Sequence, residues 1–303
     1  MANIAIIGAG NVGANTAFFI AERNIGSVVM YDVQDGLAQG KALDMMEAAP
    51  IRAYQYAISG TDSWDEVRES SVAIVTAGSV REPGSKREDL YLRNRDIIDD
   101  IAHNLADYSG TVLIATEPVD PMTMRFVTAS GLPRERVLGL GGVLDSVRLR
   151  YILARVLGIT AENITATVIG RHSDQMIALP EYTRVSGVPV SMLMEQTDLE
   201  GAIEETRRAG DVIVEMSQRA SSYYGPSAAA ADVCQAVLWD THRVLPVSFV
   251  WDGQYGIDGV AMSLPAVLGK TGIDRILEPV LDDNMVATLS DSAEELRTIS
   301  AQA

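Results

Sequence analysis

The stretch NIAIIGAGNVG, residues 3–13, decides the fold. Residues 3–7 are mostly apolar, as in a buried strand, and glycines follow at positions 8, 10 and 13. The first glycine permits a tight turn, the second lets the backbone approach a phosphate closely, and the third allows a helix to pack on the strand. A helix from about Val12 to Arg23 then offers free N–H groups at its start. The stretch therefore predicts a strand–turn–helix unit that binds a dinucleotide.

A second apolar strand, Val28–Tyr31, leads into Asp32, which lies 19 residues after Gly13. A carboxylate there can accept hydrogen bonds from both ribose hydroxyls and would repel a 2′-phosphate, so it favours NAD over NADP. A chance glycine turn with a surface aspartate is the alternative, and the order of strand, turn, helix and strand argues against it. The cofactor-binding residues predicted here are Gly8, Gly10, Asn11, Val12, Gly13 and Asp32.

Short apolar runs and amphipathic stretches alternate through the first half of the chain. This order predicts an α/β fold in which residues 1–142 form a doubly wound parallel sheet (a Rossmann domain) with ligands at the carboxyl ends of its strands. Residues 143–303 are expected to form an α+β substrate domain. Further helices are expected over residues 38–46, 87–108, 145–157, 198–217 and 282–299, and further strands over 72–76, 112–116, 164–169, 182–185 and 245–251.

The net charge is −17, from 41 acidic and 24 basic residues. This balance disfavours binding to nucleic acid or to anionic lipid. Only three of the basic residues are lysines. An acidic, lysine-poor surface suits a salty cytoplasm, and a composition bias of the genome explains it equally well.

The sequence also bears on the compartment. No apolar run reaches the roughly 18 residues that a membrane span needs. The N-terminus lacks the basic start and the cleavage site of a signal peptide. The single cysteine, Cys234, cannot form an intramolecular disulfide. We expect a cytoplasmic protein with no bound metal.

Three segments carry a resemblance to a known family: TAGSVREPGSKREDL (76–90), LDSVRLR (144–150) and GRHSD (170–174). The chain resembles the lactate/malate dehydrogenase family, and most closely its tetrameric, lactate-dehydrogenase-like malate dehydrogenases. The resemblance continues through SYYGP (222–226) and GQYG (253–256). It implies reversible hydride transfer between malate and NAD, a small dicarboxylate substrate, and a homotetramer built as a dimer of dimers.

His172 is the expected proton-transfer residue. Oxidation of a 2-hydroxy acid needs a base for the hydroxyl proton, and a neutral imidazole suits physiological pH. The other two histidines, His103 in an amphipathic helix and His242 beside a charged turn, are expected to be structural or solvated. The residues alone leave a structural role open for His172 as well, and the resemblance favours the catalytic one.

The resemblance assigns further roles around His172. Asp145 would orient the imidazole and stabilise its charged form. Arg148, three residues later on the same helix face, would hold the C1 carboxylate of the substrate with its planar fork. By spacing alone, Asp145 could equally be a helix N-cap and Arg148 a solvated arginine.

Residues 79–88 resemble the mobile lid of the family, which closes over the substrate. Arg87 would polarise the reacting carbonyl, and Arg81 stands at the specificity position, where an arginine can neutralise a second carboxylate and so favours malate over lactate. A basic exposed loop is the simpler alternative for both. The resemblance adds Ser222 and Glu117 on the substrate side, and Thr76, Ala77, Gly78, Asn94, Ala115 and Glu117 on the cofactor side.

Two positions depart from the family pattern. Glu117 stands where the family has asparagine, and Arg171 and Ser173 stand where glycines flank the histidine. A carboxylate at 117 would repel the substrate carboxylate and can only accept hydrogen bonds. Glu117 could pair with Arg171 or with a substrate-binding arginine and preserve activity, it could select another 2-hydroxy acid such as lactate, or it could leave an NAD-binding homologue with weak catalysis. We favour an active enzyme, because the other residues needed are present.

Overall fold

The computed structural model describes residues 4–79, 87–217 and 222–301, with the side chains of residues 87–89 excepted. This part of the chain contains a nine-stranded sheet in the order β14-β13-β12-β6-β5-β4-β1-β2-β3. Strands β1 to β6 are all parallel, and their order, 3-2-1-4-5-6, is the doubly wound one, so the predicted α/β fold is confirmed. Their bounds are β1 Ile4–Ile7, β2 Val28–Tyr31, β3 Ile58–Thr61, β4 Val72–Val75, β5 Thr111–Ile114 and β6 Val137–Gly139.

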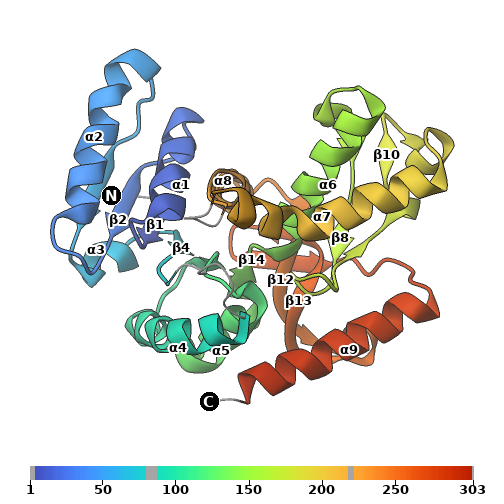
Figure 1. The fold of residues 1–303 in the computed structure, drawn as a ribbon. Helices are drawn as coiled ribbons and strands as arrows, with labels where there is room; N and C mark the ends of the chain where they lie inside the picture. Colours follow the sequence, from blue (N-terminus) through green and yellow to red (C-terminus); the bar gives the residue numbers. More distant parts are fainter. Residues whose placement is uncertain (1–3, 80–86, 218–221, 302–303) are drawn as a thin grey trace.

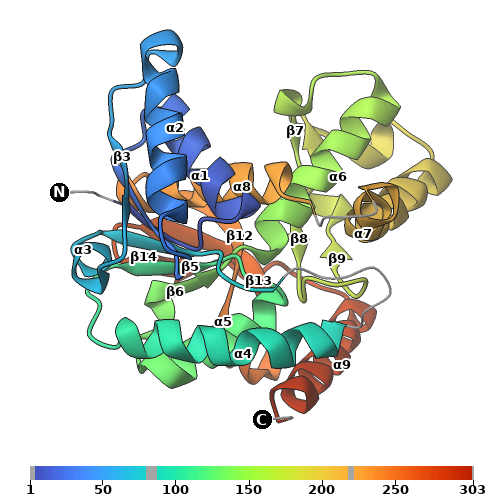
Figure 2. The ribbon, with the colours of Figure 1, turned by 60° about the vertical axis from the view of Figure 1, so that its left-hand side comes forward.

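Helices cover both faces of the central parallel strands β1, β4 and β5, whose residues are buried on both sides. In β1, Ile4 and Ile6 share a core with helices α1, α2 and α8, whereas Ala5 and Ile7 share another with α4 and α5. Figure 2 shows the two layers, with α1, α2 and α8 above the sheet and α4 and α5 below it. The bounds are α1 Asn11–Glu22, α2 Leu37–Arg52, α3 Trp64–Arg68, α4 Arg87–Asn104, α5 Val119–Ser130 and α8 Tyr224–Leu238.

The second half of the chain extends the same sheet with antiparallel strands. Strand β12 lies beside β6 through the pair Ser248 and Gly139, and β13 and β14 follow it outward. Helices α6 and α7 pack together over short strands and form a separate core, at the right of Figure 1. The bounds are α6 Gly141–Leu157, α7 Gln196–Ser217, α9 Asp283–Ser300, β7 Ile164–Thr165, β8 Val168–Ile169, β9 Ile177–Ala178, β10 Arg184–Val185, β11 Val188–Pro189, β12 Arg243–Asp252, β13 Asp258–Gly269 and β14 Gly272–Ile276, with 3₁₀ turns at Arg134–Arg136, Ala161–Asn163, Pro180–Tyr182, Val190–Met192 and Gln254–Gly256.

Several elements differ from the sequence prediction. The strand expected over residues 164–169 is divided into β7 and β8, which belong to different small sheets. Helix α8 was not predicted, because its alanine-rich sequence is buried around much of its circumference and so lacks the apolar and polar alternation of a surface helix. Helix α5 was also missed, although it follows β5 directly and orders a site residue described below.

The described residues include no helix that is both long and apolar enough to cross a membrane.

Candidate active site

The loop between β1 and α1 has the backbone form that the glycine pattern predicts. Gly8 has φ of +104°, which a side chain rarely tolerates. A Cβ atom on Gly13 would lie 1.9 Å from the carbonyl oxygen of Gly8, so this glycine allows the helix to approach the strand. A Cβ on Gly10 would meet nothing within 4 Å. Gly10 therefore faces an open space at the start of α1, where a pyrophosphate could approach the backbone.

Asp32 is hydrogen-bonded to the backbone of this loop. Its carboxylate accepts hydrogen bonds from the backbone N–H of Ala9 at 2.7 Å and of Gln34 at 2.9 Å. Lys41, on α2, donates to the carbonyl of Ala9 at 2.6 Å. The side chain of Asp32 is thus held at the carboxyl end of β2, beside the glycine loop, where ribose hydroxyls are expected.

The loops that follow β4 and β5 are tied to each other and to the glycine loop. The hydroxyl of Thr76 donates to the carbonyl of Gly8 at 2.8 Å, and that of Thr116 donates to the carbonyl of Ala77 at 2.8 Å. Asn94, fully buried on α4, accepts from the N–H of Ser79 and donates to the carbonyl of Glu117, both at 2.7 Å. These bonds hold three strand ends at one edge of the sheet.

A cleft of about 1170 Å³, its open mouth included, lies at this edge, between the loops of the parallel sheet and helices α6 and α7. The carboxyl ends of parallel strands at a switch in strand order are the usual ligand site of such folds. The predicted residues that line it are Val12, Thr76, Gly78, Ala115, Glu117, Asp145, Arg148, His172 and Ser222.

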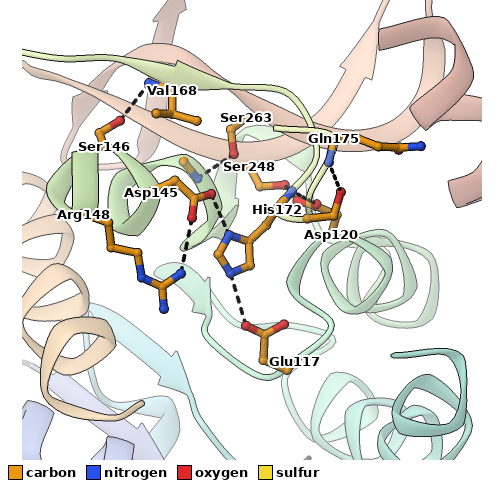
Figure 3. Close-up of polar contacts among 12 residues, drawn as sticks. Glu117, Asp120, Asp145, Ser146, Arg148, Val168, His172, Gln175, Ser248 and Ser263 are labelled. Carbon is orange, nitrogen blue, oxygen red and sulfur yellow. Dashed lines mark hydrogen bonds and ion pairs between the residues drawn. The ribbon is translucent and has the colours of Figure 1, made fainter. Parts of the chain in front are cut away.

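His172 and Asp145 form a closely bonded pair within the cleft (Figure 3). Nδ1 of the imidazole lies 2.7 Å from Oδ2 of Asp145, and the side chains are 9% and 5% exposed. Because a carboxylate can only accept, Nδ1 carries the hydrogen of this bond. The other nitrogen, Nε2, is therefore the one available for proton exchange with a ligand.

The backbone of His172 is held by a residue that the sequence did not single out. Asp120, on α5 and 2% exposed, accepts the N–H of His172 at 2.7 Å and the hydroxyl of Ser248 at 2.6 Å. Burial raises the pKa of Asp120 to about 6, and the two hydrogen bonds limit that rise. The only sequence signal was an aspartate among apolar residues just after a strand end.

Arg148 lies one turn further along α6, on the same face as Asp145. Its guanidinium is 3.5 Å from Oδ1 of Asp145 and donates to the hydroxyl of Ser222 at 3.3 Å. The side chain is 16% exposed. Asp145 thus positions both the imidazole and the guanidinium, so a carboxylate ligand held by Arg148 would lie near Nε2 of His172.

The carboxylate of Glu117 contacts Nε2 of His172. Its Oε1 lies 3.3 Å from that nitrogen, and its side chain is 46% exposed at the cleft (Figure 3). Burial alone disfavours the charged imidazolium, but the carboxylates of Asp145 and Glu117 outweigh this effect and raise the pKa of His172 to about 10.

Glu117 does not form an ion pair with Arg171, which was one of its two expected partners. The other expected partner, a substrate-binding arginine, stays a prediction, because Arg81 and the side chain of Arg87 lie outside the described residues. Arg171 instead pairs with Glu295 on α9 and donates to Gln175 at 3.4 Å, so it links the His172 loop to the C-terminal helix. The sequence could not place the carboxylate of Glu295 beside Arg171, because the two residues are far apart in the chain.

Other predicted residues lie behind the cleft or outside the described part. Ala77 and Asn94 support its floor through the bonds described above and do not line it. Arg81 lies outside the described residues, and so does the side chain of Arg87, the first residue of α4. Helix α7 adds cleft residues that the sequence did not indicate: Arg207, Gly210, Asp211 and Val214.

Comparison with protein families accounts for nearly the whole chain. Residues 2–139 match the lactate/malate dehydrogenase NAD binding domain, and residues 142–303 match the lactate/malate dehydrogenase alpha/beta C-terminal domain. A malate dehydrogenase of Methanosarcina barkeri is 40% identical over 304 residues, covering 100% of this chain and 99% of the relative.

Solved structures agree with this match. A malate dehydrogenase from Cryptosporidium parvum superposes with a TM-score of 0.95 at 33% identity, covering 99% of this chain and 98% of the other. A lactate dehydrogenase from the same organism, complexed with lactic acid and nicotinamide adenine dinucleotide, has a TM-score of 0.94 at 33% identity, covering 99% and 97%. Because the two scores are nearly equal, the backbone alone does not distinguish the two substrates.

Proposed function

This chain belongs to the lactate/malate dehydrogenase family, and we propose that it is an NAD-dependent malate dehydrogenase, which transfers a hydride reversibly between (S)-malate and NAD. The observation that carries this proposal is the His172–Asp145 pair, which faces the cleft beside Arg148. A proton acceptor and a carboxylate binder on one wall are what a 2-hydroxy acid requires.

The glycine loop fits NAD. The open space at Gly10 and the free N–H groups at the start of α1 suit the pyrophosphate, and Asp32 suits the ribose hydroxyls. Val12, Thr76, Gly78 and Ala115 would border the nicotinamide half. When bound, NAD supplies the acceptor for the hydride from C2 of malate.

The residues of the chain then handle the proton and the carboxylates. Nε2 of His172 takes the hydroxyl proton during oxidation and returns it to the carbonyl oxygen during reduction. Asp145 keeps the imidazole in the required tautomer and stabilises its charge. Arg148 holds the C1 carboxylate, Arg87 stabilises charge on the reacting oxygen, and Arg81 pairs with the second carboxylate.

The choice of malate over lactate depends on residue 81. An arginine that closes over the substrate favours a dicarboxylate, because its charge would otherwise be buried without a partner beside the methyl group of pyruvate. The relatives that are about 40% identical over their full length and are named malate dehydrogenase support the same choice.

A steady-state assay of NADH consumption with oxaloacetate, with pyruvate and with neither acid tests the proposal. We expect kcat/KM for oxaloacetate to exceed that for pyruvate by about 100-fold or more. Faster turnover of pyruvate would show a lactate dehydrogenase. Binding of NADH without turnover of either acid would show the catalytically weak homologue.

The proposal also covers the oligomeric state, the cellular compartment and the domain boundary. We propose a homotetramer built as a dimer of dimers, in the cytoplasm, with a division between domains at residues 142 and 143. Val147 and Tyr151 on α6 are 41% and 63% exposed one turn apart, which supports a contact between subunits there. Light scattering coupled to size exclusion would measure the number of subunits, and a monomer would contradict this part.

A further inference from the structure

The contact between Glu117 and His172 restricts the protonation state of the imidazole. Nδ1 of His172 is already occupied by its hydrogen bond to Asp145. A neutral imidazole in that tautomer leaves an unprotonated Nε2, which is an acceptor, and so is the carboxylate of Glu117. Two acceptors held 3.3 Å apart repel each other, so this approach is favourable only when a proton lies between them.

We propose that Glu117 keeps a proton on Nε2 of His172 before the substrate enters, so that the resting protein is set to donate a proton and must first lose it to oxidise malate. This inference rests on the proposed function, since it concerns the nitrogen that serves the reaction. It also gives the unusual residue at position 117 a definite effect, because an amide at the same place would add no charge and would not select the protonated form.

The charged groups around the imidazole come from several elements. Asp145 and Arg148 lie on α6, Glu117 follows β5, and the carboxylate of Asp120 on α5 accepts the backbone N–H of His172. On its own loop, Arg171 is committed to Glu295. Helix α7 adds Arg207 and Asp211 to the cleft. Of the described side chains, Glu117 is the one that the structure places against Nε2.

Substrate binding would have to change this contact. The hydroxyl or carbonyl oxygen of the substrate must approach Nε2, where Oε1 of Glu117 now lies. During reduction, Nε2 gives its proton to the carbonyl oxygen, and the neutral imidazole that results regains a proton from water after the product leaves. The carboxylate of Glu117 is 46% exposed and contacts the nearly buried imidazole, so it could pass this proton from solvent to Nε2.

The histidine rings allow a test that does not depend on turnover. The chain has only three histidines, so selective isotope labelling gives three ring signals, and the variant His172→Asn identifies the one from His172. The titration midpoint of that signal would be measured by NMR in the wild type, in Glu117→Gln and in Asp174→Asn. Asp174 is an exposed carboxylate in the same loop, so its variant is a control for loss of one negative charge nearby.

We expect the wild-type midpoint to lie well above 6.5, the ordinary value for histidine. Glu117→Gln should lower it by about one pH unit or more, and Asp174→Asn by less than half of that. A wild-type midpoint near 6.5, or equal shifts in the two variants, would overturn the proposal.

Kinetic pH profiles provide the second measurement. In wild type and Glu117→Gln, kcat/KM would be followed against pH for malate oxidation and for oxaloacetate reduction. The acid limb of oxidation and the alkaline limb of reduction should both move to lower pH in the variant, by about the same one unit. The readout is the midpoint, because the equilibrium of the reaction constrains the ratio of forward to reverse rates at a given pH.

The two measurements separate the two hypotheses. A shift of the NMR midpoint in a protein that turns over neither malate nor oxaloacetate would support the role of Glu117 and contradict the proposed function. Turnover of oxaloacetate with the same NMR midpoint in the two variants would support the proposed function and contradict the role of Glu117.

Discussion

The glycine loop, which reaches the cleft through Val12, and the proton-transfer site are constructed in different ways. The loop consists of consecutive residues whose backbone is proposed to bind the pyrophosphate, and Gly8 and Gly13 are needed there because no side chain fits. The proton-transfer site consists of side chains from α6, from the loop after β5 and from the loop after β8. Its residues are up to 55 positions apart in the chain, from Glu117 to His172.

Because of this difference, mutations in the two regions should affect different properties: cofactor binding in the loop and catalysis in the network of side chains. A loop of backbone groups tolerates most side chains and fails when a Cβ atom is added at a close approach. A network of charged side chains retains its shape after a conservative exchange but changes its protonation. Damage to the loop should therefore remove cofactor binding, and damage to the network should remove turnover while the cofactor still binds.

The largest effect is expected from His172→Asn. Loss of the proton-transfer group should lower kcat for oxaloacetate reduction about 10³- to 10⁴-fold. The dissociation constant of NADH, measured by fluorescence titration, should stay within about twofold, because Nε2 is not part of the glycine loop. Residual turnover close to wild type would mean that another group, such as Glu117, transfers the proton.

The second prediction is a matched pair in the glycine loop. Gly13→Ala places a Cβ atom 1.9 Å from a backbone oxygen, so the helix must move, and the free energy of unfolding should fall by about 2–4 kcal/mol. Gly10→Ala meets nothing within 4 Å and should change that free energy by less than about 1 kcal/mol. It should still weaken NADH binding about tenfold or more, because its methyl group enters the space left for the pyrophosphate.

Urea unfolding and NADH titration of both variants measure this pair. Equal loss of stability in the two variants would show that the space at Gly10 has no special role. Unchanged NADH affinity in Gly10→Ala would show that the pyrophosphate lies elsewhere.

The third prediction concerns the carboxylate binder. Arg148→Lys retains the charge and loses the planar fork, so KM for oxaloacetate should rise about 10- to 100-fold, with little change in NADH affinity. Arg155→Lys is the matched control on the same helix, because Arg155 pairs with Glu205 at the surface and not with the cleft. Equal KM values in the two variants would leave Arg148 with a purely structural role.

The smallest effect is expected from Asp120→Asn and appears in stability against pH. The unfolded chain loses this proton near pH 3.8 and the folded protein near pH 6, so the folded state binds more protons between these values. Stability from this group therefore falls as pH rises through that interval, by roughly 1–3 kcal/mol, and stays lower above it. Asparagine cannot ionise, so the variant should lack this fall.

Urea unfolding at pH 4.5, inside this interval, and at pH 7, about one unit above it, at one protein concentration, gives the comparison. The other carboxylates titrate in both proteins, and the difference between wild type and variant isolates Asp120. The same pH dependence in both proteins would show that Asp120 does not take up a proton on folding in this range.

The success of the sequence prediction differed between the two regions for a physical reason. The strand, the turn and helix α1 follow from residues 3–13 alone, because glycine at a close approach is a local requirement. The pairing of His172 with Asp145 was expected from a family resemblance, since nothing in the spacing of two distant residues shows that they meet. The hydrogen bond from the His172 backbone to Asp120 was not expected at all, because the helix that carries Asp120 gave no pattern of its own.

Position 117 shows most clearly that the sequence does not reveal which distant side chains meet. The sequence identified Glu117 as a departure and left its partner open, since a charged residue at a strand end can face any of several loops. The structure showed that the carboxylate meets Nε2 of His172 and that Arg171 is engaged by Glu295.

By itself, the sequence determined the glycine loop and the doubly wound order of strands and helices, and it predicted which residues bind the cofactor and carry out catalysis. These features depend on local periodicity and on glycine, which act over a few neighbouring residues. Only the tertiary structure decided which carboxylate faces which nitrogen of His172. That outcome depends on how helices α5, α6 and α9 pack around one loop, and the protonation of the imidazole depends on distances of a few ångströms that no local pattern encodes.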